Sequence, residues 1–236
     1  MTDFVYIPPQ NPYLKIVYKD EYLMVLNKPG GLLSVPGRLP IHHDSLITRV
    51  RNSYGYAEAV HRLDMDTSGL LVVSLSREAT SALGKMFIQK QICKQYLALV
   101  RGDTAQEGAL SYPIRCDLLH RPLHVVDYMQ GKKALTRFTK LPLQDFLINS
   151  FKQKLASTKI SLVSLIPVTG RSHQLRIHMQ NYGTPILGDR FYGKDHIQDI
   201  NCDLCLHAAF LAFTHPFTNE RLCFKSTPFF LKEFPF

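Results

Sequence analysis

The chain has 236 residues, of which 45% are hydrophobic, 11% aromatic and 20% charged. This composition excludes wholesale disorder, because enough apolar side chains are present to bury a substantial core. The 28 lysines and arginines against 19 acidic residues give a formal net charge of +9 at pH 7, which favours a polyanionic partner and makes nucleic acid the first candidate.

The five cysteines are odd in number and are scattered through a chain large enough to fold without disulfides. We therefore expect reduced thiols in a cytoplasmic protein. The first ten residues hold Asp3, Pro8 and Pro9 and lack a basic stretch followed by an apolar run, so they do not resemble a secretory signal. No apolar stretch approaches the length of a membrane-spanning helix, and the sequence therefore predicts no membrane partner.

The chain is expected to start with an arm and then a β-hairpin. Residues 1–13 contain prolines and show no periodicity, so we interpret them as a surface arm that precedes a single domain spanning 14–236. Lys15–Val17 and Tyr22–Leu26 are short apolar runs on either side of a polar turn. This pattern is typical of a hairpin.

A short amphipathic helix is predicted between residues 44 and 54. Apolar residues recur there at helical spacing, Asp44 or Ser45 can cap the first turn, and Gly55 can end the helix. A second helix is expected after Ser76, which is a plausible N-cap for a segment with a continuous apolar face.

Two strands, Ala59–Leu63 and Leu70–Leu75, are predicted on either side of a bend that is rich in carboxylate and hydroxyl side chains. A further strand, Tyr96–Val100, follows the second helix. The bend between the first two strands carries the densest polar chemistry in this half of the chain.

The remainder alternates strand-like segments such as Leu135–Phe138 and Ile160–Leu165 with polar turns, including a Lys-rich insertion at Phe151–Lys159. A helix is predicted over Ser172–Tyr182, and β-rich sequence over Leu206–Phe230 leads into an aromatic tail. Strands outnumber helices without regular alternation. We therefore expect an α+β fold with a central mixed, largely antiparallel sheet flanked by helices and loops.

Asp64 is the first candidate catalytic residue. It lies in the bend after a predicted strand, next to Arg62 and several hydroxyl side chains, and could act as a nucleophile or general base. The competing interpretation is structural, because an aspartate followed by Thr67, Ser68 and Gly69 is also a common turn sequence.

A second cluster, residues 169–176, lies at the start of the predicted C-terminal helix. Exposed backbone N–H groups and the helix dipole favour an anion such as phosphate there, and Arg171 and Arg176 strengthen that interpretation. The alternative is that both arginines are surface residues or partners in structural ion pairs.

Other motifs carry weaker signals. Tyr96 opens a strand and could stack on a base or simply fill the core. Cys202 and Cys205 lack the second cysteine pair that a closed zinc site needs, so no metal site is predicted. Neither a Walker A sequence nor a GxGxxG motif occurs, and we expect no nucleotide cofactor.

Together these segments resemble the RluA family of RNA pseudouridine synthases from about Leu14 to Phe230. The blocks that carry the resemblance are Asn27-Lys28-Pro29 with Gly31-Leu32-Leu33, HRLDMDTSGLL at 61–71, Lys94-Gln95-Tyr96, GRSHQLRIH at 170–178, and Pro185 to Asp189 with Tyr192-Gly193. The resemblance implies a pseudouridine synthase catalytic domain without an N-terminal S4 domain, and an isomerisation that needs no cofactor or metal.

The resemblance also implies roles for individual residues. Asp64 would be the catalytic aspartate, attacking either C6 of the uracil or C1′ of the ribose. Arg176 would favour its ionised form, and Tyr96 would pack against the target base. Arg62 would fill the gap left by the flipped uridine.

The implied partner is structured RNA, held at hairpin loops by Arg62, Arg171, His173, Gln174 and His61, and not DNA. Further blocks resemble members that modify both tRNA and rRNA, which implies uridine 32 of the tRNA anticodon loop and uridine 746 of 23S rRNA as targets. We expect a monomer. The open alternatives are a non-catalytic RNA-binding or ribosome-assembly protein on the same scaffold, and a hydrolase that uses His61 and Asp64 on a small substrate.

Overall fold

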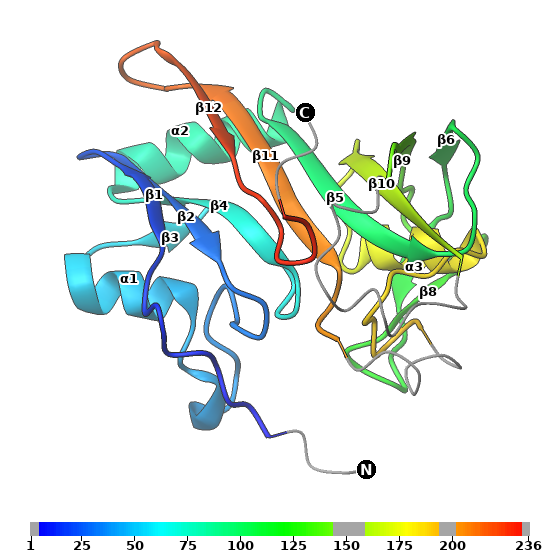
Figure 1. The fold of residues 1–236 in the computed structure, drawn as a ribbon. Helices are drawn as coiled ribbons and strands as arrows, with labels where there is room; N and C mark the ends of the chain where they lie inside the picture. The colour runs from blue at the N-terminus through cyan, green and yellow to red at the C-terminus, as the bar shows by residue number, and fades with distance from the viewer. Residues whose placement is uncertain (1–4, 144–158, 194–201, 233–236) are drawn as a thin grey trace. The chain divides into compact units, whose positions relative to one another are not determined.

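The computed structural model describes residues 5–143, 159–193 and 202–232 (Figure 1). The chain divides into two compact units, the first built from Met1–Cys93 and Ala208–Ser226, and the second from Lys94–His207 and Thr227–Phe236. In the described part of the chain, eight strand pairs have a register given residue by residue, and these eight are antiparallel. The expected α+β class with a largely antiparallel sheet is confirmed.

The first unit is a sheet with the strand order β1-β2-β4-β11, to which β12 and β3 add at β11 and β4. The elements of this unit are β1 (Ile16–Lys19), β2 (Leu23–Lys28), η1 (Pro40–His42), α1 (Leu46–Tyr54), β3 (Glu58–Ala59), β4 (Ser68–Ser74), α2 (Arg77–Ile88), most of β11 (Leu206–Thr214) and β12 (Arg221–Lys225).

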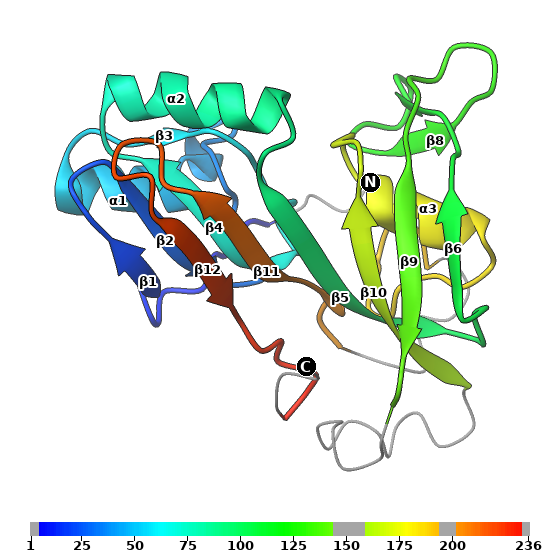
Figure 2. The same cartoon turned by 90° about the horizontal axis from the view of Figure 1, so that it is seen from above.

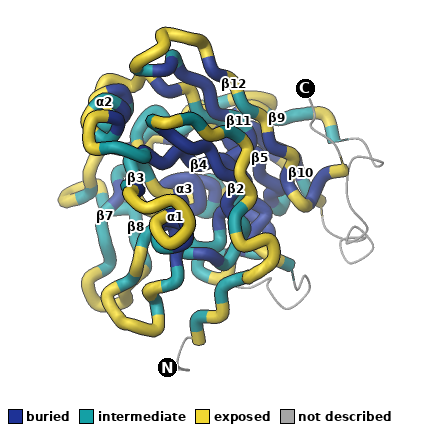
Figure 3. Tube along the Cα trace, turned by 90° about the vertical axis from the view of Figure 1, so that its left-hand side faces the viewer, coloured by how far each residue is buried: buried dark blue, intermediate teal, exposed yellow. Residues whose placement is uncertain are grey.

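Strands β2 and β4 are buried along almost their whole length, as Figure 3 shows, because alternate side chains pack against both faces of the sheet. Helix α2 covers one face of this sheet (Figure 2). Its Leu83 and Met86 pack there with Leu70 and Val72 of β4. The register pairs Lys28 with Gly69, so the end of β2 lies beside the polar bend that precedes β4.

The second unit has the strand order β5-β10-β9-β6, with a separate hairpin of β7 and β8. Its elements are most of β5 (Cys93–Arg101), β6 (Glu107–Leu110), β7 (Ile114–Cys116), β8 (His124–Val126), β9 (Thr136–Leu141), β10 (Ile160–Pro167) and α3 (Gln174–Asn181). Helix α3 packs against β8, β9 and β10, and Ile177 shares a small core with Ile114 and Tyr192.

The local signals for the hairpin, helices and helix ends are confirmed. The side chain of Ser45 accepts a hydrogen bond from the Thr48 amide, and that of Ser76 accepts one from the Ala79 amide. Gly55 ends α1 with a positive φ of 85°. Most of the insertion predicted at Phe151–Lys159 lies outside the described residues.

The predicted strand Ala59–Leu63 is wrong for most of its length, since β3 comprises Glu58–Ala59 only. The backbone N–H and C=O of Leu63 bond to the Ser34 hydroxyl instead of to a neighbouring strand. None of the helices in the described part of the chain is long and apolar enough to cross a lipid bilayer.

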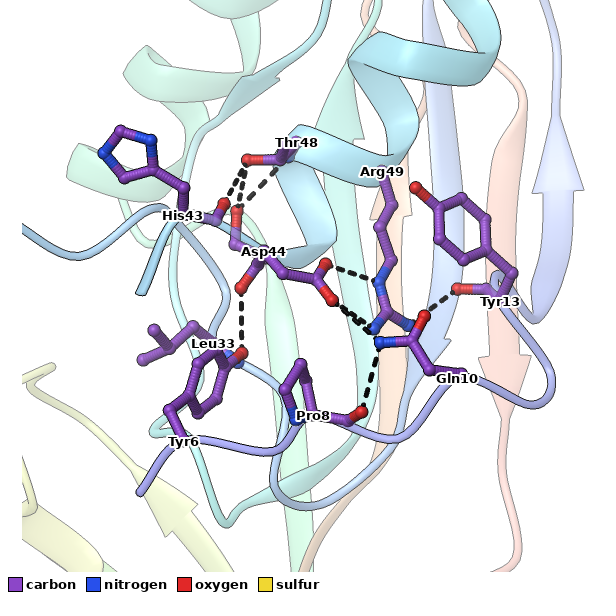
Figure 4. Close-up of polar contacts among 10 residues, drawn as sticks. Tyr6, Pro8, Gln10, Tyr13, Leu33, His43, Asp44, Thr48 and Arg49 are labelled. Carbon is purple, nitrogen blue, oxygen red and sulfur yellow. Dashed lines mark hydrogen bonds and ion pairs between the residues drawn. The ribbon is translucent and has the colours of Figure 1, made fainter. Parts of the chain in front are cut away.

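The N-terminal segment from Val5 to Tyr13 lies against the start of α1 (Figure 4). The hydroxyl of Tyr6 donates to the Asp44 carbonyl at 2.8 Å, and the Asp44 carboxylate accepts from Gln10 at 3.0 Å. The same carboxylate binds the buried guanidinium of Arg49 through two hydrogen bonds of 2.7 and 2.8 Å.

Candidate functional site

Asp64 lies in a loop of the first unit that connects β3 to β4. Asp64 is half-buried, and its backbone carbonyl accepts a hydrogen bond from the Thr67 amide at 3.2 Å. The turn interpretation of this bend is therefore confirmed at the level of backbone geometry. A turn does not exclude catalysis, because it leaves a half-exposed carboxylate on a fixed backbone.

Lys28, at the end of β2, holds the backbone that follows Asp64. Its side chain is fully buried, and the ammonium donates to the carbonyl oxygens of Pro29, Leu32 and Met65 at 2.8, 2.7 and 2.8 Å. These bonds use all three N–H groups of an ammonium. Burial lowers the pKa of Lys28 to about 7, against the opposing effect of the Asp66 and Asp64 carboxylates.

Ser34 holds the backbone that precedes Asp64. Its buried hydroxyl donates to the Leu63 carbonyl at 2.7 Å and accepts from the Leu63 amide at 3.1 Å. Gly30 passes so close that a Cβ there would lie 3.1 Å from the Asp66 carbonyl oxygen. Segment 28–34 therefore fixes the chain on both sides of Asp64, and we call it the clamp segment.

Sequence reasoning placed Lys28 in a motif but gave the clamp segment no role. The available signal was a lysine ending an otherwise apolar strand, directly before a Pro-Gly-Gly turn. A lysine in that position is either exposed at the strand end or buried with several acceptors, and it is the second that occurs here.

His61 and Arg62 differ in their exposure. The Nε2 atom of His61 accepts a hydrogen bond from the Val72 amide at 3.0 Å, and its ring lies 4.6 Å from that of Phe87. This geometry favours a structural role for His61 over direct contact with RNA. Arg62 is exposed, as an RNA-binding residue must be.

Tyr96 and Arg176 belong to the second unit. Tyr96 lies near the start of β5, is 9% exposed, and pairs in register with Leu165 of β10. Two residues before it, burial lowers the pKa of the Lys94 ammonium. The predicted preference of Tyr96 for a strand is confirmed.

Arg176 lies on α3 and is buried. Its Nε and Nη2 atoms each donate to a different carboxylate oxygen of Asp189 at 2.7 Å, and the ion pair is almost completely shielded from water. The guanidinium also lies 5.1 and 5.2 Å from the ring centroids of Phe191 and Tyr192. Residues from Gln174 to Met179 are all buried, because α3 is covered on more than one side.

The residues before α3 are arranged differently from the expected anion site. His173 adopts a left-handed conformation with φ 54°, so the helix begins one residue later, at Gln174. The Oε1 atom of Gln174 accepts from the Arg171 amide and the Thr169 hydroxyl. The Arg171 amide, one of the backbone donors expected to bind a phosphate, is therefore already bonded within the protein.

Of the RNA-binding candidates in this unit, Arg171 is exposed and the other two are tied to the protein. The amide nitrogen of the Gln174 side chain donates to the Leu135 carbonyl and the Thr136 hydroxyl, which favours a structural role. The Nδ1 atom of His173 lies 2.7 Å from the Tyr192 hydroxyl. The Arg171 Nε donates to the Lys133 carbonyl at 3.1 Å.

Cys202 and Cys205 are not joined by a disulfide bond. A hydrogen bond with Cys202 and burial both raise the pKa of Cys205 well above its usual value. Within residues 5–143, 159–193 and 202–232, no group of three or more His, Cys, Asp or Glu side chains is arranged to hold a metal ion.

The two units thus supply different chemical groups. The first presents a carboxylate on a backbone that buried donors fix on both sides, which suits a nucleophile or general base. The second presents a guanidinium held in one orientation, with exposed basic residues nearby in the sequence.

Comparisons with known proteins point to one family. The model of the family described as RNA pseudouridylate synthase matches residues 22–181. Two proteins named dual-specificity RNA pseudouridine synthase RluA, from Pasteurella multocida and Salmonella typhimurium, are 43% and 45% identical to this chain over 226 and 221 residues. These alignments cover 95% and 93% of this chain and 98% and 95% of the relatives.

Among solved structures, Human RNA Pseudouridylate Synthase Domain Containing 1 is similar with a TM-score of 0.72 and 29% identity. The similarity covers 91% of this chain and 83% of that one. The likeness therefore extends to the arrangement of strands and helices as well as to the motifs.

Proposed function

Because this chain belongs to the RNA pseudouridylate synthase family and is thus an enzyme that isomerises uridine within RNA, we propose that Asp64 is its nucleophile, with Arg176 and Tyr96 as its catalytic partners. The observation that carries the proposal is the fixed backbone around Asp64, bonded at Leu63 by Ser34 and at Met65 by Lys28. Such preorganisation favours a nucleophile, because the carboxylate does not have to lose orientational freedom when it attacks.

In the proposed reaction, the Asp64 carboxylate attacks C6 of the uracil or C1′ of the ribose, and the glycosidic bond breaks. The base turns and forms a new bond from C5 to C1′. The carboxylate leaves C1′ as this bond forms, or leaves C6 after it has formed. The C5 proton is then removed, with Tyr96 packed against the base, and N1, which is no longer bonded to the ribose, takes up a proton. Atoms balance within the substrate, so the isomerisation consumes no second reactant.

Arg176 serves the ionised form of the carboxylate in this proposal, because hydrogen bonds donated to a carboxylate favour its charged form. Arg62, which is exposed, takes the space of the flipped uridine in the RNA stack. Arg171 contacts phosphate groups. His173, which is positioned by Tyr192, contributes to RNA binding in this proposal.

As substrates we propose uridine 32 of the tRNA anticodon loop and uridine 746 of 23S rRNA. The support is the name of the relatives, dual-specificity enzymes with 43% and 45% identity over nearly the whole chain. Hairpin loops expose splayed bases, which a protein can reach more easily than bases within a paired helix. Such substrates place the enzyme in the cytoplasm.

The test is pseudouridine mapping by carbodiimide-dependent reverse-transcription stops, on tRNA and 23S rRNA from cells that lack the gene. The intact protein should restore stops at both uridines, and Asp64→Asn should restore neither while still binding RNA. Asp66→Asn is the matched control, since it alters a second carboxylate in the same loop, and it should retain most activity. Restoration by Asp64→Asn would overturn the mechanism, and restoration at one RNA only would reduce the proposed substrates to that RNA.

A further inference from the structure

The buried carboxylate of Asp189 is the partner of Arg176, and nothing in the proposed reaction yet uses it. We infer that Asp189 is a positioning residue for the isomerisation, which turns the Arg176 guanidinium from a mobile cation into a hydrogen-bond donor of fixed direction. This inference rests on the proposed function, because it takes Arg176 as a catalytic group.

The geometry leaves the guanidinium almost no rotational freedom. Asp189 accepts from both Nε and Nη2 at 2.7 Å, so the plane of the carboxylate defines the plane of the guanidinium. Two aromatic rings, those of Phe191 and Tyr192, lie within 5.2 Å of the guanidinium carbon. A guanidinium has five N–H groups. Asp189 accepts from two of them, and this arrangement thereby fixes the directions of the other three.

Asp189 also builds the turn that carries those rings. Its Oδ1 atom accepts from the Phe191 and Tyr192 amides at 2.9 and 3.1 Å, and its carbonyl accepts from the Gly193 amide at 2.8 Å. The Tyr192 hydroxyl in turn accepts from the His124 amide at 3.0 Å. One carboxylate therefore fixes both the guanidinium and the aromatic groups beside it.

The charge of the pair supports a positioning role over a purely electrostatic one. Side-chain exposure is 2% for Arg176 and 0% for Asp189, so water does not separate the two charges. At distances beyond the pair, opposite charges in contact act as a dipole and not as a net cation. Arg176 can then act on a substrate or on a nucleophile only through the direction of its remaining N–H groups.

The chain offers a matched control in the ion pair of Arg49 and Asp44 (Figure 4). Arg49 is as buried as Arg176, and it binds its aspartate through the same two nitrogen atoms at 2.7 and 2.8 Å. A tyrosine ring, that of Tyr13, lies 4.8 Å from its guanidinium carbon. This pair holds the N-terminal segment on α1 and has no role in the proposed reaction.

The experiment measures kcat and KM of the full-length protein on an RNA that it modifies, with each rate divided by the folded fraction from urea unfolding. Asp189→Asn should lower kcat about 100-fold, the effect expected when a catalytic group is misplaced by about 1 Å, and change KM less than about threefold. Asp44→Asn should leave kcat within about twofold of the intact protein. If Asp189→Asn does not fold, Asp189→Glu and Asp44→Glu give the same comparison with the charge retained.

A double-mutant cycle separates positioning from general structural support. Arg176→Lys cannot form the bidentate pair, so adding Asp189→Asn to it should lower kcat no further. A multiplied loss in the double variant would overturn the inference, as would equal kcat values for Asp189→Asn and Asp44→Asn.

The same measurements separate this inference from the proposed function. A slow Arg176→Lys variant together with a fully active Asp189→Asn variant would overturn the positioning role alone. A fully active Arg176→Lys variant would overturn the role of Arg176 and the inference that depends on it. The outcome for Asp64→Asn decides the role of the nucleophile independently of both.

Discussion

The ammonium of Lys28 donates a 2.8 Å hydrogen bond to the carbonyl oxygen of Met65, the residue that follows Asp64. A strand end and a loop that lie 37 positions apart in the sequence are thereby joined through a buried cation. With Ser34 bonded to Leu63, the backbone of the proposed nucleophile is held from both sides. The position of Asp64 thus depends on two buried residues from a distant part of the sequence.

The stability of the protein should depend on the protonation of Lys28. Its pKa is lowered from 10.5 to about 7 in the folded state, so between these values the unfolded chain binds more protons than the folded one. The difference in unfolding free energy between the intact protein and Lys28→Met should therefore not change with pH below about pH 7. Above that pH it should rise by up to about 1.4 kcal/mol per pH unit.

Urea unfolding at pH 6, 7, 8 and 9 measures this difference. Lys85→Met, at an exposed position on α2, is the control, and its difference from the intact protein should not change with pH. A flat profile for Lys28→Met across the whole range would contradict the buried, low-pKa state of Lys28.

Removal of the Ser34 hydroxyl should damage both stability and catalysis. Ser34→Ala leaves the buried N–H and C=O of Leu63 without their partner, which costs about 1–3 kcal/mol of unfolding free energy. Because Leu63 precedes Asp64, kcat per folded molecule should also fall, with little change in KM. The comparison is Ser76→Ala, which removes the N-cap of α2 and costs about 1 kcal/mol. If both variants keep full kcat, the clamp segment does not control the position of Asp64.

The elements that were predicted correctly are determined by interactions between residues that are close in the sequence. Ser45 and Ser76 cap their helices because each hydroxyl meets an amide three residues further on. The predicted strand Ala59–Leu63 failed because Ser34, 29 positions earlier, takes the hydrogen bonds of Leu63. A partner so distant leaves no periodic signal in the local sequence.

The same distinction applies to the candidate site. Asp64 was proposed from the sequence because carboxylate and hydroxyl side chains gather after an apolar run, whereas Lys28 was missed because its burial depends on the carbonyl of Met65. Gln174 was expected to face RNA, but β9 and the residue before it supply partners for its amide group. The burial of Arg176 likewise depends on Asp189, which no helical pattern around residue 176 reveals.

Two glycines with positive φ should respond differently to alanine. Gly69, at φ 112°, packs against β11 so closely that a Cβ would lie 2.4 Å from the Ala208 carbonyl oxygen, while Gly55, at φ 85°, has nothing within 4 Å. Gly55→Ala should cost only the backbone strain, about 1–3 kcal/mol. Gly69→Ala should cost about 1–3 kcal/mol more, because β4 and β11 must also separate. Equal unfolding free energies for the two variants would show that the contact between these strands yields without cost.

Arg171 should contribute one phosphate contact to RNA binding. Arg171 is exposed, and its bond to the Lys133 carbonyl uses Nε, so the outer part of the guanidinium can reach a phosphate. Arg171→Ala should weaken binding at low salt and reduce the slope of log Kd against log salt concentration by about 0.7–0.9, the value for one neutralised phosphate.

Arg51→Ala, which removes an exposed arginine already paired with Glu58 at 2.6 Å, should leave the slope unchanged. Filter binding of a hairpin RNA between about 50 and 200 mM salt measures both slopes. An unchanged slope for Arg171→Ala would mean that Arg171 only braces the loop at Lys133, and that other basic residues make the phosphate contacts.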